Sequence, residues 1–118
     1  MKRDPHVYLI DIVDAADAIL DAVHGISLDD YCNSRLIRSA VEREFTIIGE
    51  ALNNLSRVEP EWFASIEQAP RIIGFRNKLT HEYDKVDNVV AWGVIQGSLL
   101  QLRAACLALL DKSGLGGR

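Results

Sequence analysis

Cysteine is scarce in this sequence, which has only Cys32 and Cys106, and these two do not form a CxxC pair. Isolated cysteines on apolar helical stretches are usually small core residues. We therefore expect neither a disulfide framework nor a zinc or redox centre built on cysteine. A core of sufficient size must come from the apolar side chains themselves.

An excess of positive charge is also absent. Thirteen Lys and Arg against seventeen Asp and Glu give a net charge of −4. No global basic field draws in duplex nucleic acid, although a small basic site remains compatible with this balance. The N-terminus carries Asp4, Asp11 and Asp14 where a signal peptide needs an apolar run. The longest apolar stretch, 89–110, is amphipathic. We expect a cytoplasmic protein without membrane association.

The common catalytic signatures are missing as well. The sequence contains no HExxH, GxGxxG, P-loop or GxSxG pattern, and His6 and His24 have no second ligand at metal spacing. A site with no bound metal and no cofactor is the expectation.

What is present fits one helical domain. The chain has 118 residues, 48% of them hydrophobic, which suits a single domain over 1–112 followed by a glycine-rich tail, 113–118. No alternating strand pattern occurs. Apolar residues recur at spacings of three and four, and they predict an all-α, antiparallel bundle of four to five helices.

Proline and cap residues set the expected helix bounds. Helices are predicted from Pro5 to His24 and from Leu28 to Arg57, with a short segment after Pro60, a third main helix from Pro70 and a last one over 89–110. The first helix carries two adjacent apolar stripes. Such a broad face suits either a fully buried bundle helix or one that also meets a second chain.

One stretch concentrates polar chemistry, RIIGFRNKLTHEY over 71–83, with three cations, an imidazole and a phenol. An arginine can hold phosphate oxygens and stabilise charge in a transition state, and a histidine can move a proton. On a continuous helix, position 81 lies about 140° around the axis from Arg76. Either the helix ends near Thr80, or a second copy of the chain completes the site. Read alone, however, RxxxxH also suits a surface or capping histidine, and Tyr83 suits the core edge.

The segment RNKLTHEY resembles the Arg-x4-His-x-Tyr motif of the HEPN superfamily, and specifically of the HepT-like toxins of HEPN/minimal-nucleotidyltransferase pairs. The similarity continues through IIGFRNKLTHEYDKVD and VVAWGVIQGSLLQL, and RSAVEREFTIIGEALNNLS resembles the second helix of that family. It covers about Arg38 to Leu102. Glu82 stands where many relatives carry glycine, which leaves the motif intact but alters its local charge.

This resemblance implies a homodimer that brings two motifs together in a cleft and acts as a metal-independent endoribonuclease on RNA. Arg76 and His81 become the catalytic pair, and Asn77 and Lys78 support them. Tyr83 corresponds to the tyrosine to which the partner antitoxin, an MntA-like minimal nucleotidyltransferase, transfers AMP.

Two other interpretations stay open. The chain could be a non-catalytic HEPN module that binds a nucleotide or its partner, which the net negative charge favours. It could also be a purely structural helical dimer, in which Arg76 and His81 are replaceable without consequence.

Overall fold

Short polar side chains and prolines begin most of the helices. The Asp4 side chain accepts a hydrogen bond from the His6 backbone N–H, and Pro5 follows at the first helical position. Ser27 and Asp30 form a reciprocal capping box. The Asp87 side chain accepts from the backbone N–H of Val89. The expected helix starts at Pro5 and Pro60 are confirmed.

The computed structural model describes residues 4–81 and 87–113, with the backbone alone at 80 and 81. Within these ranges the chain is all-α and has no strand, which confirms the expected class. The helices are α1 (Pro5–Val23), α2 (Leu28–Asn33), α3 (Arg35–Val58), α4 (Pro60–Ser65), α5 (Ala69–His81), α6 (Asn88–Gln96) and α7 (Ser98–Lys112).

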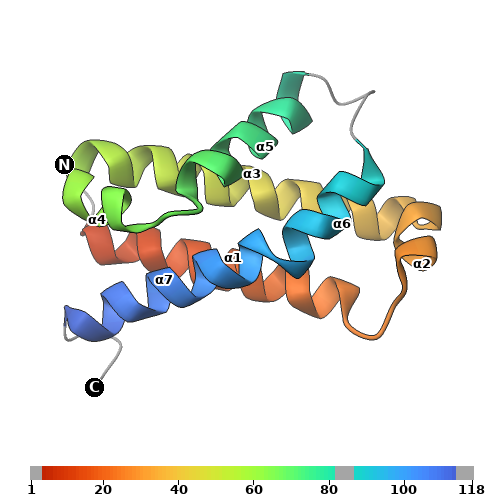
Figure 1. The fold of residues 1–118 in the computed structure, drawn as a ribbon, viewed down its shortest axis with the longest axis horizontal. Helices are drawn as coiled ribbons and strands as arrows, with labels where there is room; N and C mark the ends of the chain where they lie inside the picture. Colours follow the sequence, from red (N-terminus) through yellow and green to blue (C-terminus); the bar gives the residue numbers. More distant parts are fainter. Residues whose placement is uncertain (1–3, 82–86, 114–118) are drawn as a thin grey trace.

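The long elements run side by side in an elongated molecule of 41 × 29 × 24 Å. In Figure 1, successive long elements α1, α3, α5 and the α6–α7 pair run in alternating directions. Helix α3 packs against both α1 and α5, and α7 packs against α1. Helix α3 therefore lies between the N-terminal helix and the helix that carries the RNKLTH segment.

The core matches the predicted stripes. Every member of the α3 stripe is buried, namely Val41, Phe45, Ile48, Leu52 and Leu55. The second stripe of α1 is buried too, with Tyr8, Ile12, Ala15 and Ile19 inside the chain's own core. The broad apolar face of α1 is thus used within one chain, so it gives no support to a second-chain interface there.

The expected long helix from Leu28 to Arg57 is divided. Ser34 has extended backbone angles (φ −112°, ψ 100°), ends α2 and caps α3 through its hydroxyl, which accepts from the Ile37 N–H at 3.2 Å. The break lets α2 turn and bury Tyr31 against Trp92 of α6, with ring centroids 5.6 Å apart. Burial raises the pKa of the Tyr31 hydroxyl to about 12.

The expected last helix is divided as well, because Gly97 interrupts it with non-helical angles (φ −128°, ψ −80°). These two divisions raise the described helices above the four to five expected. The stretch Asn88–Lys112 is the single one in the described ranges that is long and apolar enough to cross a membrane. Its buried residues include Ile95, Leu99 and Leu102, which join the bundle core.

The cysteines lie apart and both are free. Cys106 is fully buried in the core, as expected, and burial raises the pKa of its thiol to about 12. Cys32 is half-buried on α2. Of the expected tail, 113–118, the described ranges include Ser113 alone, which ends α7.

Candidate functional site

Helix α5 is fixed to the bundle by its apolar side. Ile72, Phe75 and Leu79 are buried, and the Phe75 ring meets Phe45 of α3 edge-on, with centroids 5.0 Å apart. Because side chains on one helix keep fixed angular positions, this anchoring also sets the directions of the neighbouring Arg76 and Lys78. The polar residues of the motif therefore rest on a well-packed support.

Arg76 lies over a glycine of the neighbouring helix. A methyl group added at Gly49 of α3 would stand 2.6 Å from Cγ and 2.9 Å from Cδ of Arg76. Real Cβ atoms do not approach so closely, so the aliphatic stem of the arginine occupies space that only glycine leaves open. We call Gly49 and the Arg76 stem that covers it the arginine seat.

Polar groups around the guanidinium complete its placement. Its Nη2 lies 3.8 Å from Oε1 of Glu50 on α3, and its Nη1 donates to Oδ1 of Asn77 at 3.3 Å. The Arg76 side chain is 20% exposed, whereas that of Glu50 is 63% exposed. An ion pair this long and exposed contributes little stability. Its consequence is directional, since it helps to orient a guanidinium that is only partly exposed, with its Nε buried.

The other predicted site residues lie at or beyond the end of α5. Asn77 and Lys78 are exposed on this helix. The helical backbone continues through His81, the last residue of α5, whose side chain lies outside the description, and Tyr83 lies outside the described residues. The structure therefore places Asn77 beside Arg76. The positions of the His81 side chain and of Tyr83 stay predictions.

The length of α5 bears on the two alternatives raised by the sequence for completing the site. Because the helix includes position 81, that position is rotated by about 140° from Arg76 about one continuous axis. Helix register within one chain thus sets the two positions on different sides of α5. Of the two alternatives, this register favours completion of the site by a second chain.

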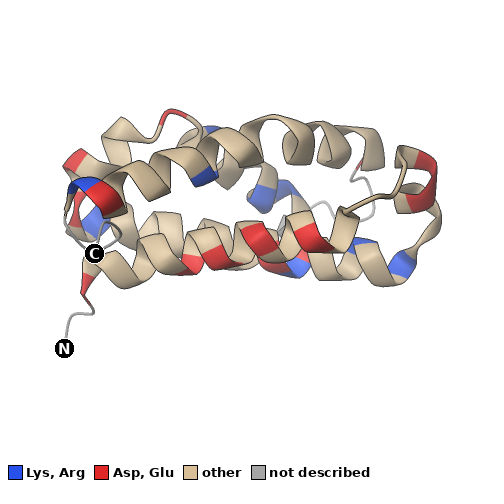
Figure 2. Ribbon diagram, turned by 90° about the horizontal axis from the view of Figure 1, so that it is seen from below, with Lys and Arg blue, Asp and Glu red and all other residues tan. Residues whose placement is uncertain are grey.

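Charge is distributed very unevenly between helices. The sequence of α5 has Arg71, Arg76 and Lys78 and no acid, whereas that of α1 has four aspartates and no Lys or Arg. Figure 2 shows acidic positions along the N-terminal helix. Among those aspartates, Asp17 accepts from Nε of Arg103 on α7 at 2.6 Å. The motif helix is a local cationic surface on an acidic molecule.

Potential metal ligands do not gather in the described ranges, where no group of three or more His, Cys, Asp or Glu comes together. His6 instead contacts Asp4, with Nδ1 and Oδ1 2.7 Å apart, and its ring meets Trp62 edge-on. In α5 the charged groups of the described part are cations, which suit an anionic ligand.

Sequence reasoning assigned no role to Gly49 or Glu50. A signal was present, because glycine inside a strongly amphipathic helix costs about 1 kcal/mol relative to alanine and marks a close approach. That the approaching group is Arg76 requires knowledge of how α3 and α5 pack.

Comparison with known proteins places the chain in a family. The family model described as "Ribonuclease HepT-like" matches residues 12–109. A protein of Caldanaerobacter subterraneus named as a putative RNase is 30% identical over 110 residues, which cover 93% of this chain and 97% of the relative.

Two further relatives agree with this match. A protein of Thermococcus cleftensis named "Probable ribonuclease HepT" is 31% identical over 109 residues, covering 87% of this chain and 93% of the relative. A Methanocaldococcus jannaschii protein, also named as a putative RNase, is 28% identical over 102 residues, covering 86% and 93%. No solved structure matches the chain with statistical significance. Since the family model spans most of the chain and includes α5 with its arginine seat, the chain belongs to the HepT-like ribonuclease family.

Proposed function

We propose that this protein is an endoribonuclease that cleaves RNA without a metal ion and serves as the toxin of a toxin–antitoxin pair. The observation that carries this proposal is the arginine seat in a chain of the HepT-like family. A guanidinium on a buried stem is held in place before substrate arrives, and preorganised charge is the most effective form of transition-state stabilisation. The names of the relatives given above support the same reaction class.

The reaction starts at the ribose. The 2′-oxygen attacks the adjacent phosphorus as its proton passes to a base, and the bond from phosphorus to the 5′-oxygen breaks as that oxygen gains a proton. His81 moves the proton, and Arg76 stabilises the charge of the phosphorane. Asn77 holds the guanidinium and Lys78 attracts the phosphates. The products are a 2′,3′-cyclic phosphate and a free 5′-hydroxyl.

The active form in this proposal is a cytoplasmic homodimer. The register of α5 separates positions 76 and 81, so Arg76 of one chain works with His81 of its partner across a shared cleft. In this proposal, neither the attack of the 2′-oxygen nor the departure of the 5′-oxygen requires a metal or an organic cofactor.

The deciding experiment is cleavage of a labelled single-stranded RNA in the presence of EDTA. We expect wild type to cut and His81→Ala to lose activity. His24→Ala is the matched control, because His24 is exposed at the end of α1 and has no part in the mechanism. Equal cleavage by wild type and His81→Ala would remove His81 from the mechanism.

Arg76 is tested in the same assay. Arg76→Ala should lower kcat by about 10²–10³-fold, the range seen when a donor to a developing oxyanion is removed. Arg76→Lys should recover only part of this loss, because an ammonium cannot reproduce the planar fork of donors. Full activity in Arg76→Ala would show that the reaction does not use this guanidinium.

Regulation is assigned to Tyr83. A partner nucleotidyltransferase transfers AMP from ATP to the phenol oxygen, forming a phosphodiester and releasing pyrophosphate. The added phosphate pairs with the nearby cations Arg76 and Lys78, and the adenosine blocks RNA entry. Tyr83→Phe should keep cleavage activity but escape silencing on co-expression with the partner. If that variant is still silenced and still gains the mass of AMP, another residue is the acceptor.

The second candidate function is a non-catalytic module that binds a nucleotide or the partner enzyme. The net charge of −4 favours it, since RNA-cleaving surfaces are usually basic. Binding of RNA by wild type without any cleavage in EDTA would select this candidate.

A further inference from the structure

A groove of about 310 Å³ lies between α5 and α6, beside the arginine seat but distinct from it. It is lined by Arg71, Gly74, Phe75, Lys78, Val90 and Val94. Val90 is 50% exposed, whereas Phe75 and Val94 are 7% and 4% exposed, so Val90 provides most of the open apolar surface of the groove. All six residues lie within the described ranges.

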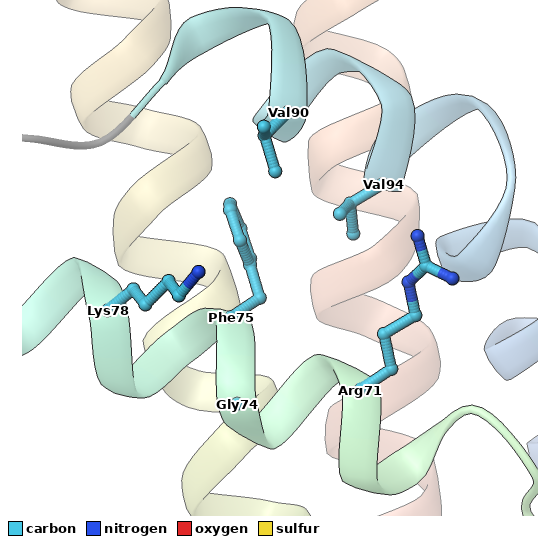
Figure 3. Close-up of a pocket in the computed structure, with 6 residues that line it drawn as sticks. All are labelled: Arg71, Gly74, Phe75, Lys78, Val90 and Val94. Carbon is cyan, nitrogen blue, oxygen red and sulfur yellow. The ribbon is translucent and has the colours of Figure 1, made fainter.

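The groove combines an apolar centre with cations on both sides. Figure 3 shows the Phe75 ring extending toward Val90, with Lys78 on one side of it and Arg71 on the other. The two cations are seven residues apart on α5, a separation of about 10 Å along the helix. No acidic residue is among those that line the groove. A ligand that fits must be apolar and flat in the middle and anionic at both ends.

A nucleotide within a single strand has this shape. Its base is a flat π-system, and one phosphate lies on each side of it along the backbone. The volume is at the small end of the range for ligand sites, which suits one base rather than a larger molecule. Proteins that hold single-stranded RNA use this same pairing of apolar or aromatic contacts with cations along the backbone.

We propose that this groove is a base-binding subsite for single-stranded RNA. One base lies against Phe75, Val90 and Val94, while Arg71 and Lys78 contact the flanking phosphates. The inference rests on the proposed function, because it takes RNA as the ligand. Phe75 immediately precedes Arg76 on α5, so a base in the groove sets which phosphate lies near the guanidinium. The subsite therefore determines where the strand is cut.

The test is a methyl NMR titration of the full chain with a 2′-O-methyl hexauridylate, which cannot be cleaved because it has no free 2′-hydroxyl. We expect the methyl signals of Val90 and Val94 to shift, while those of Val41, buried on α3, stay unchanged. A hexamer of the same phosphates without bases should bind more weakly and leave the Val90 and Val94 signals in place.

Substitutions separate the contacts with the phosphates from the contacts with the base. Lys78→Gln and Arg71→Gln should each weaken binding about fivefold or more and lower the slope of log affinity against log salt by about 0.7. Val90→Ser should weaken binding by a similar factor without changing that slope. Lys112→Gln is the matched control, since Lys112 is exposed on the last turn of α7, and it should bind as wild type does.

The outcomes distinguish this inference from the proposed function. If the hexamer binds and unmodified RNA is cut, but Val90 and Val94 do not respond, the subsite is wrong and the ribonuclease stands. If both methyl groups respond but no RNA is cut, the subsite stands and the ribonuclease falls. If the chain neither binds nor cuts RNA, both fall. Signals that move with protein concentration alone would assign the groove to a contact between copies and overturn the subsite.

Discussion

The missing β-carbon of Gly49 determines where Arg76 can lie. The arginine stem fills the space over this glycine, which orients a partly exposed guanidinium by contacts made below the surface. The exposed Glu50 carboxylate, 3.8 Å away, adds direction but little stability. Packing rather than ion pairing therefore sets the position of the candidate catalytic cation.

Gly49→Ala tests this packing. The added methyl group must displace the Arg76 stem, so we expect at least a tenfold loss of RNA cleavage, most of it in kcat. Overpacking costs about 1–3 kcal/mol and the gain in helix propensity returns about 1 kcal/mol, so the free energy of unfolding should fall by about 0–2 kcal/mol and the melting temperature by at most several degrees. Gly93→Ala is the control, since a β-carbon there meets nothing within 4 Å. Unchanged cleavage in Gly49→Ala would separate the seat from catalysis.

Tyr31 offers a prediction about stability. Its side chain is fully buried, and its hydroxyl has no hydrogen-bond partner among the described residues. Removing a buried, unsatisfied hydroxyl avoids a desolvation cost, so Tyr31→Phe should unfold at a free energy equal to wild type or about 1 kcal/mol higher. Denaturant titration at pH 7 measures this difference. A loss above about 1 kcal/mol would mean that the hydroxyl does have a partner.

The same residue predicts an alkaline effect. The Tyr31 pKa is raised from 10.0 to about 12 by burial, so the unfolded chain releases this proton at lower pH than the folded chain. The stability of the protein therefore falls as pH rises from 10 to 12. Tyr31→Phe lacks this contribution, and its stability should fall less over that interval.

At the scale of helices, the sequence predicts well where the long helical segments lie. It predicts poorly where those segments are interrupted. Periodicity identified the buried stripes of α1 and α3 because each depends only on neighbours along one helix. The divisions at Ser34 and Gly97 depend on contacts between helices, such as Tyr31 packing against Trp92. A serine in the middle of a periodic segment is ambiguous, since it is tolerated in a helix and also favoured as a cap.

Ser34→Ala measures how much the cap at the division between α2 and α3 contributes to the free energy of unfolding. The Ser34 hydroxyl satisfies the N–H of Ile37 at the start of α3, and losing this cap should lower the free energy of unfolding by about 1 kcal/mol. Ser56→Ala is the matched control. The Ser56 hydroxyl donates to the Asn53 carbonyl inside α3, so its loss should cost less than about 0.5 kcal/mol. Equal effects would show that Ser34 does not act as a cap.

At the scale of the whole molecule, the sequence nominates residues for the site but does not show how they assemble. The segment 71–83 stands out by its cations, imidazole and phenol and by the resemblance of RNKLTHEY to a family motif, whereas the relation of Arg76 to Gly49 and the α5–α6 groove depend on packing. The sequence of one chain also does not show which residues a second copy contributes to the site. The broad face of α1, one argument for a dimer, is buried within the chain, so the arguments that remain are the register of α5 and the family resemblance.

The dimer prediction follows from that register. Sedimentation at micromolar concentration should show a homodimer, with an interface of at least about 1,000 Å². Two inactive variants, Arg76→Ala and His81→Ala, should recover activity when unfolded together and refolded as a mixture. Half of the dimers then pair one variant with the other, and each such dimer has one intact shared site. The mixture should reach about a quarter of wild-type activity by this symmetry. No recovery, or a monomer in sedimentation, would contradict the shared site.

The opposed charges of α1 and α5 have a consequence for approach in solution. Helix α3 separates an acidic helix from a cationic one (Figure 1), so the molecule has an electric dipole as well as a net charge of −4. Near a polyanion, the field repels the α1 side and attracts the α5 side, which turns the protein before any contact forms. Its retention on a charged resin should then depend on which helix the resin attracts. An anion exchanger should retain it through α1, and a heparin resin should retain it through α5.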